Sequence, residues 1–262
     1  MGIVTVSRGS YSSGKEIAEK AAQKLGYDCI SREIILEASK EFNIPEIKLT
    51  QAFEDAPSIL DRFSHGKKKY IAYTQAALLK YLTKDNLVYH GFAGHYFVQG
   101  ISHVLKILII AGLDYRISNV MERDKIPTKE EASRFIKKID EQRRKWGQKL
   151  YGIDPWAPSA YDLVLNIDKI TIEDAVDTIC RISGLKQFQT TSESKSAMDD
   201  LALTVKVKNF LIDVKPSVEV HIENRFVYLK PDVPLTQESE IVNKMGEIMK
   251  TIPDIKGIQV VK

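Results

Sequence analysis

The residues best suited to chemistry lie near the start of the chain, in the stretch Gly9-Ser10-Tyr11-Ser12-Ser13-Gly14-Lys15-Glu16. This stretch fits the pattern G-x-x-x-x-G-K, in which the glycines let backbone N–H groups surround a phosphate and the lysine reaches the outer phosphates of a nucleotide. The pattern predicts an ATP-binding site formed by Gly9, Ser10, Ser12, Ser13, Gly14, Lys15 and Glu16.

The flanking segments place this loop between a strand and a helix. Ile3–Val6 is β-branched and favours a buried strand, and residues 17–25 carry apolar side chains at helical spacing. A helix that starts at the loop adds unpaired N–H groups and a partial positive charge. The alternative, a glycine-containing turn followed by an exposed lysine, explains the flanks less well.

Glu16 departs from the usual pattern, in which a Ser or Thr hydroxyl follows the lysine and binds Mg²⁺. A carboxylate could hold Mg²⁺ directly or through water, or it could repel the phosphates. The hydroxyls of Ser12 and Ser13 are alternative ligands. Glu16 is therefore a candidate Mg²⁺ ligand.

Composition limits the class of protein. The chain has 262 residues, 44% hydrophobic and 28% charged, which is typical of a globular protein with one large domain or two ordinary ones. A net charge of +3 does not indicate a nucleic-acid partner. The most apolar run, 104–113, is too short to span a bilayer, and the two cysteines are far apart. We therefore expect no membrane span and a cytoplasmic location.

Strand-like and helix-like segments alternate over the first two thirds of the chain, which predicts a parallel α/β sheet. Further strands are expected at 86–90, 107–111 and 161–167. Helices are expected from 34 onward and at 47–53, 59–63, 70–82, 114 onward, 128–145 and 171–182. In an open parallel sheet, ligands bind beyond the carboxyl ends of the strands.

That rule places His90, Gly91 and Gly94 near the site, because they follow a predicted strand. His90 and His95 match no metal-binding spacing, so a packing role is favoured for both. Ser31 could cap the next helix, and Arg32 beside it could grip a phosphate bidentately or lie on the surface.

A strongly charged helix follows Thr128, which begins an S/T-x-x-E capping box with Glu131. This helix carries a group of charged residues that includes Arg134, Asp140, Arg143 and Arg144. Such a helix is either a solvated amphipathic helix or a mobile lid whose arginines close on transferring phosphates. Charge alone favours the first interpretation.

The composition changes after the sheet. Residues 186–197 are polar and rich in Ser and Thr, which predicts a linker between domains at 1–185 and 198–262. A helix at 198–213, a hairpin at 218–222 and 226–229, a helix at 238–251 and a strand at 255–261 would form a small α+β domain.

Residues 1–185 resemble the cytidylate kinase-like family of P-loop nucleoside monophosphate kinases. The likeness rests on Ser7 to Ala18, Gly26 to Ile35, Val88 to Gly94, and the stretch from Asp140 through Tyr151-Gly152 to Leu165. The resemblance implies a three-layer α/β/α P-loop fold. It implies transfer of the ATP γ-phosphate to a nucleoside monophosphate, with CMP or dCMP as the expected acceptor and Mg²⁺ as the cofactor. It also implies a lid at 134–144.

The resemblance gives roles to particular residues. It implies catalytic roles for Lys15, Asp140, Arg143 and Arg144, and substrate binding by Arg32, Gly91 and Arg134. Phe92 and Ala93 stand where those kinases place an Arg and an Asp. A catalytically weak nucleotide sensor and a kinase for another small phosphorylated acceptor therefore remain alternatives.

Residues 198–262 resemble a BON-type module in element order and in the ending Ile255 to Val261. This likeness implies a docking or regulatory role toward a protein or lipid partner.

Overall fold

The computed structural model describes residues 2–31, 33–54, 64–91, 94–212, 218–230 and 238–260. Its first sheet has five strands in the order β2-β3-β1-β4-β5, and every neighbouring pair is parallel. This arrangement confirms the predicted parallel α/β fold. The strands are β1 (Ile3–Arg8), β2 (Asp28–Ile30), β3 (Leu87–His90), β4 (Val104–Ala111) and β5 (Leu163–Ile167).

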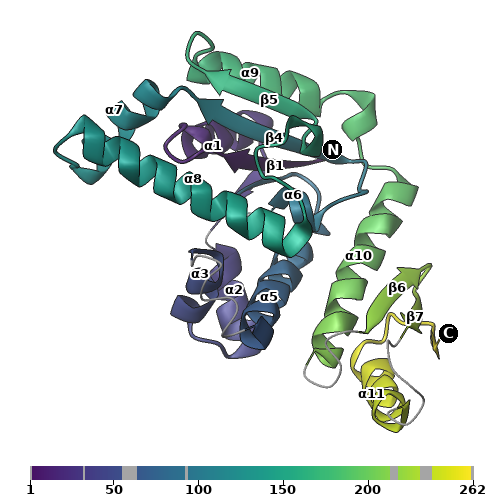
Figure 1. Ribbon diagram of the computed structural model, residues 1–262. Helices are drawn as coiled ribbons and strands as arrows, with labels where there is room; N and C mark the ends of the chain where they lie inside the picture. The colour runs from purple at the N-terminus through teal and green to yellow at the C-terminus, as the bar shows by residue number, and fades with distance from the viewer. Residues whose placement is uncertain are drawn as a thin grey trace.

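Helices cover both faces of this sheet, which gives the expected three layers (Figure 1). Helices α1 (Gly14–Leu25) and α9 (Ile172–Ser183) pack on one face. The other face is covered by α5 (Ser64–Leu82), α6 (Gly94–Phe97) and the C-terminal part of α8 (Lys129–Tyr151). Among the described residues, α2 (Glu33–Phe42) and α3 (Glu46–Glu54) lie beside α5, and α7 (Leu113–Asp124) lies beside α8.

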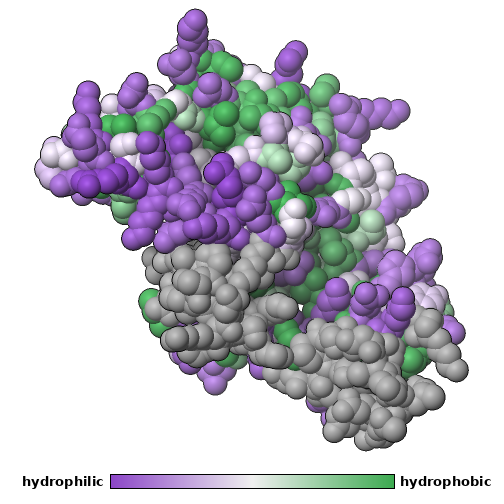
Figure 2. All heavy atoms as spheres, viewed as in Figure 1, coloured by the Kyte–Doolittle hydropathy of each residue, from purple (hydrophilic) through white to green (hydrophobic). Residues whose placement is uncertain are grey.

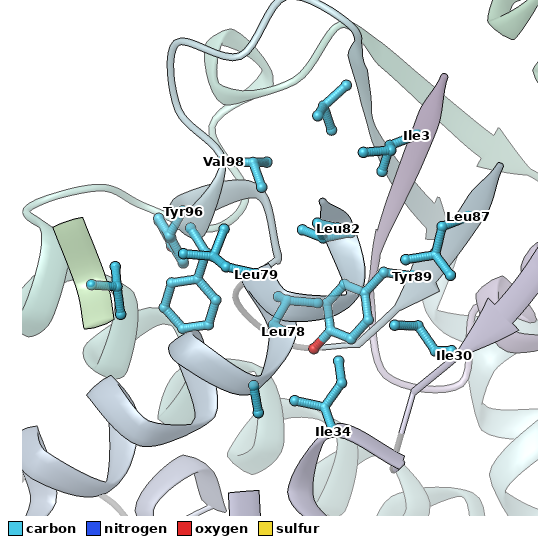
Figure 3. Packing of buried hydrophobic residues seen from close by; sticks show 14 of the residues in the cluster. Ile3, Ile30, Ile34, Leu78, Leu79, Leu82, Leu87, Tyr89, Tyr96 and Val98 are labelled. Atoms are coloured by element: carbon cyan, nitrogen blue, oxygen red, sulfur yellow. The ribbon is translucent and has the colours of Figure 1, made fainter. Parts of the chain in front are cut away.

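Side-chain alternation along the strands builds a core on each face, since neighbouring residues point in opposite directions. Ile3 joins the cluster under α5, and Val4 joins the cluster under α1. Figure 3 shows the first cluster, in which the Tyr89 ring extends toward Ile34 of α2. A Cβ added at Gly94 would lie 2.6 Å from this ring, and one at Gly91 would meet its hydroxyl. Both glycines are therefore required by the packing of Tyr89.

The C-terminal part has the element order that the sequence predicts. It consists of α10 (Ser192–Leu211), β6 (Glu219–Glu223), β7 (Phe226–Lys230), α11 (Glu238–Thr251) and β8 (Gly257–Val260). The hairpin β6–β7 turns at Asn224 and Arg225, both with positive φ, and β8 adds to β7 in parallel. These elements form a three-stranded sheet in the order β6-β7-β8 with its own core.

Helix α10 belongs to both cores. Met198 and Val205 pack with the residues of α5, whereas Val207 and Leu211 pack against the small sheet. The helix begins at Ser192, inside the stretch predicted to be a linker, because the Thr191 hydroxyl caps its first turn. The domain boundaries at 185 and 198 stay a prediction.

Other elements differ from the sequence prediction in extent. Strand β2, only three residues long at the edge of the sheet, was not predicted, and α5 begins at Ser64 rather than near Tyr70. Two short 3₁₀ helices occur at Pro158–Ala160 and Lys186–Phe188. The helix predicted at 59–63 lies outside the described residues. In the described ranges, no helix has the length and apolar character needed to cross a membrane.

The shared role of α10 can be tested at Met198, whose side chain is only 1% exposed in the core under α5. We expect Met198→Ala to lower the free energy of unfolding by ~2–4 kcal/mol, because it removes buried contacts and leaves a cavity. Urea denaturation followed by tryptophan fluorescence measures this, since Trp146 lies in the same cluster. Met249→Ala is the matched control, because Met249 is 43% exposed. Equal effects of the two changes would contradict the packing of α10 on α5.

Candidate functional site

The glycine loop connects β1 to α1 and is tied to β4 beneath it. The Gly9 backbone N–H donates to the Ile109 carbonyl at 2.9 Å. The buried Ser12 hydroxyl lies 2.9 Å from the Gly9 carbonyl and 3.0 Å from the Ile109 carbonyl, and it can donate to either. Tyr11 and Ser13 both have φ of 60°, the left-handed conformation. These constraints hold the loop at the N-terminus of α1, where N–H groups and the helix dipole favour an anion.

A charged network joins the loop to helices α7 and α8. The Ser10 hydroxyl donates to Asp140 at 2.8 Å, and Arg116 donates to Asp140 and to the Ser10 carbonyl, each at 2.6 Å. The Arg116 and Asp140 side chains are only 13% and 22% exposed. Water therefore screens this ion pair less than a surface pair. The structure brings Asp140 to the loop, and it adds Arg116, which the sequence placed only at the start of a helix.

The hairpin of α7 and α8 also contacts Tyr11 in the loop. The Arg123 guanidinium lies 4.3 Å from the centre of the Tyr11 ring, and Phe135 of α8 lies 6.2 Å from it. The Tyr11 hydroxyl donates to Asp124. Burial, followed by this hydrogen bond, raises the pKa of Tyr11 to about 12. Nearby, Asn119 donates to the Tyr11 carbonyl at 3.0 Å.

Lys15 and Glu16 lie on the exposed side of α1 in this structure. The Lys15 amine is 3.7 Å from Glu19, and 65% of its side chain is exposed. Glu16 is 3.1 Å from Lys20 and 51% exposed. Exposed pairs of this kind contribute roughly 0–1 kcal/mol, so little holds Lys15 away from a phosphate in the loop.

Arg143 lies at the junction of α8 with the end of β1. It donates to the Arg8 carbonyl at 3.1 Å. Burial, and next the charge of Arg8, lower the pKa of Arg143 to about 10, so the guanidinium stays protonated at neutral pH. Both residues line a cavity of about 30 Å³, which has room for about one or two water molecules. The other residues lining it are Ser7, Gly91, His95, Pro155, Trp156 and Tyr161.

The two histidines act as internal hydrogen-bonding groups. His90 Nδ1 accepts from Arg8 at 2.8 Å, and His95 Nδ1 lies 2.8 Å from the Ser7 hydroxyl. Burial lowers the pKa of His90 to about 4 and that of His95 to about 3. Both rings are therefore neutral at pH 7. In the described ranges no group of three His, Cys, Asp or Glu side chains could hold a metal ion.

The remaining predicted site residues are less closely associated with the loop. Arg144 is exposed and lies 3.2 Å from Asp154, and Arg134 is exposed on α8. Arg32 lies outside the described residues. The predicted lid at 134–144 is part of one continuous 23-residue helix, which begins with Thr128 as its predicted cap.

A cleft of about 720 Å³ opens beside the loop, between α8 and the sheet. Figure 2 shows hydrophilic residues along α8 and apolar surface above it, over β4 and β5. Leu108, Ile110 and Val164 supply apolar lining, while Lys137 and Trp156 are among the residues of its walls. This volume is within the range of pockets that bind small molecules.

Comparison with known proteins gives a consistent result. The model of the cytidylate kinase-like family matches residues 3–169. The chain belongs to the cytidylate kinase-like family. It is 29% identical over 184 residues to a cytidylate kinase of Sulfolobus acidocaldarius, covering 70% of this chain and 94% of that protein. It is 27% identical over 190 residues to a cytidylate kinase of Archaeoglobus fulgidus, covering 71% and 97%.

A crystal structure of an uncharacterised protein from Eubacterium ventriosum shares the fold. Its TM-score is 0.52 at 17% identity, and the match covers 70% of this chain and 98% of that one. The cytidylate kinase-like match ends at residue 169, before α10 and the small sheet. The comparisons give no support to the resemblance of the C-terminal domain to BON modules, which stays a prediction from its element order and its ending.

The neutral His90 predicts a pH dependence of stability. The unfolded chain binds a proton at this histidine near its ordinary pKa of 6.5, whereas the folded protein binds it only near 4. The contribution to stability is therefore fully present above pH ~6.5 and is lost as the pH falls toward 4, at up to ~1.4 kcal/mol per pH unit. In His90→Asn the amide oxygen can still accept from Arg8 but does not titrate.

Urea denaturation between pH 5 and 6.5 measures this effect. We expect a smaller slope of unfolding free energy against pH in His90→Asn than in the wild type. His221→Asn is the control, because His221 is exposed on β6. An unchanged slope in His90→Asn would show that His90 titrates alike in both states.

Proposed function

We propose that this protein transfers the γ-phosphoryl group of ATP to a nucleoside monophosphate, with CMP or dCMP as the first acceptors to test. The observation that carries the proposal is the glycine loop between β1 and α1, tied through Ser10 to Asp140 of α8 and Arg116 of α7. Membership of the cytidylate kinase-like family and the names of the two archaeal relatives support the choice of reaction and acceptor.

In this proposal the chain binds phosphates and orients them. The N–H groups around Gly9 to Gly14 surround the donor phosphates, and Lys15 leaves Glu19 to reach the outer ones. Arg143 and Arg144 stabilise the charge of the transferring phosphoryl group. We assign no general base, because positioning and electrostatics carry most of phosphoryl transfer. Arg32, Gly91 and Arg134 are proposed to bind the acceptor.

Family membership also suggests Mg²⁺, which would neutralise charge on the donor phosphates. The oxygen donors at the loop fit a metal held largely by phosphates, which is usual for Mg²⁺ with nucleotides. Glu16 is the proposed protein ligand, because both alternative hydroxyls already have partners. The Ser12 hydroxyl lies within hydrogen-bond distance of two carbonyls, and the Ser13 hydroxyl is 2.8 Å from the Tyr115 hydroxyl. Glu16 would have to turn from Lys20 to serve.

A nucleotide sensor that does not turn over is the second candidate. It is favoured by α10, which packs against α5 in the kinase-like part and also against the small sheet. A nucleotide-dependent movement near α5 could therefore pass to the C-terminal domain. We propose that this domain docks to a protein or lipid partner.

Lys15→Ala tests the proposed reaction. We expect at least a hundredfold loss of CMP-dependent ADP release, because the other lysines of α1, Lys20 and Lys24, lie further along the helix and pair with carboxylates. The assay follows ADP release from ATP and Mg²⁺ with CMP, dCMP, UMP, AMP and GMP in turn. Lys24→Ala is the matched control, since Lys24 lies in the last turn of the same helix and pairs with Asp177. Normal turnover in Lys15→Ala would refute the assignment. Nucleotide binding by the wild type without turnover of any acceptor would favour the sensor.

Glu16→Gln tests the metal ligand. We expect the Mg²⁺ concentration for half-maximal ADP release to rise about tenfold, because an amide oxygen is a weaker ligand than a carboxylate. Glu19→Gln is the control, since Glu19 is one turn further along α1 and pairs with Lys15. An unchanged Mg²⁺ requirement in Glu16→Gln would leave Glu16 as a surface partner of Lys20.

A further inference from the structure

Arg8 borders the glycine loop but has no role in the reaction proposed above. It is the last residue of β1 and immediately precedes Gly9. Its aliphatic stem packs closely against Gly14, where an added Cβ would lie 2.6 Å from Arg8 Cβ and 3.1 Å from Arg8 Cδ. The side chain therefore runs beside Gly14, the second glycine of the motif.

The immediate partner of Arg8 orients its charge without neutralising it. One guanidinium nitrogen donates to His90 Nδ1 at 2.8 Å, so this nitrogen of His90 carries no proton. The lowered pKa of His90, about 4, keeps the ring neutral at pH 7. In the part of the chain that the structure describes, Arg8 has no carboxylate at ion-pair distance.

The surroundings of Arg8 leave its positive charge poorly compensated. Burial lowers the pKa of Arg8, and Arg123 lowers it further, while Tyr89 and Glu19 oppose the change. A second guanidinium, that of Arg143, donates to the Arg8 carbonyl at 3.1 Å. Asp140 compensates part of the charge of Arg143. A cation withdrawn from water, such as that of Arg8, is unfavourable unless an anion joins it. Such a cluster in a cleft is typical of a functional site.

We propose that Arg8 is a phosphate-binding residue, whose guanidinium contacts a phosphate held at the glycine loop. His90 occupies only one of its five N–H groups, which leaves others for the paired hydrogen bonds that arginine makes with phosphate. The inference rests on the proposed function, because the phosphate would belong to ATP or to the acceptor monophosphate. Phosphate chemistry is common to both sources.

Thermal unfolding of the full chain, with and without inorganic phosphate at matched ionic strength, tests the site. We expect phosphate to raise the melting temperature of the wild type and of Arg181→Met, an exposed control on α9, but not of Arg8→Met. Without phosphate, Arg8→Met should melt at the same or a higher temperature than the wild type, because an uncompensated charge is removed.

A structural role for Arg8 gives the opposite result. A lower melting temperature of Arg8→Met without phosphate, together with a phosphate-induced rise as large as that of the wild type, would overturn the proposal. If Arg8→Met does not fold, Arg8→Lys carries the test, because it keeps the charge and loses the paired hydrogen bonds. Phosphate affinity of Arg8→Lys equal to that of the wild type, measured by calorimetry, would also overturn it.

Calorimetry with a non-hydrolysable ATP analogue and with CMP then identifies the source of the phosphate. Weaker binding of the analogue by Arg8→Lys assigns Arg8 to the donor, weaker binding of CMP assigns it to the acceptor, and unchanged binding of both overturns the proposal. None of these measurements requires turnover. If substitution of Arg8 leaves phosphate binding unchanged while the wild type shows Lys15-dependent turnover, this inference alone is overturned. If substitution of Arg8 weakens phosphate binding but the wild type shows no turnover, only the proposed reaction is contradicted.

Discussion

The candidate site depends on one interaction, the ion pair between Arg116 and Asp140. Both of these side chains also hydrogen-bond to Ser10 of the glycine loop. The loop itself is attached to the sheet through Gly9 and Ile109, which fixes its base but not its outer side. The ion pair adds the second attachment, and it does so from two helices that are distant from the loop in sequence. Because the pair is partly buried and hydrogen-bonded to Ser10, separating α8 from the loop would expose a carboxylate and a guanidinium that now bind each other. Together with the apolar contacts of Ile136 and Trp146, this contact positions α8 and with it Arg143.

Charge is distributed unevenly around this attachment. The histidines at the carboxyl end of β3 and in α6 are neutral, and Lys15 and Glu16 remain in water. The poorly solvated charges near the loop are therefore those of the arginines and of Asp140. An arginine keeps its charge when it is partly buried, whereas burial makes a lysine or histidine lose its proton more readily. A site assembled from partly buried arginines and backbone N–H groups therefore stays positive over a wide pH range. That property suits a phosphate, which is negatively charged throughout this range.

The sequence predicts the loop and the parallel sheet well, because both depend on local patterns. The run of β-branched residues before Gly9 and the helical spacing after Gly14 are enough to place β1 and α1. Strand β2 could not be found this way, since its three residues at the sheet edge carry only one buried side chain. The extent of α10 was misjudged for a different reason: its polar first turns are stabilised by the Thr191 cap and by contact with α5, and neither shows in composition. Arg116 and Arg8 were missed as site residues because their partners are distant along the chain.

Gly91 and Gly94, which follow β3, show that a glycine in the sequence can indicate either close packing or a binding site. From sequence, Gly91 and Gly94 suggest a backbone that approaches a ligand, yet the ring of Tyr89 already excludes a side chain at both positions. A glycine required by packing can still line a site, as Gly91 does in the small cavity with Arg8 and Arg143. The two roles are distinguished by what surrounds the glycine. Gly94 is buried against Tyr89 in the core, while Gly91 also faces a cavity lined by two arginines. Gly91 therefore borders the site beside Arg8 and Arg143, at the carboxyl ends of β1 and β3, where a parallel sheet of this topology binds its ligands.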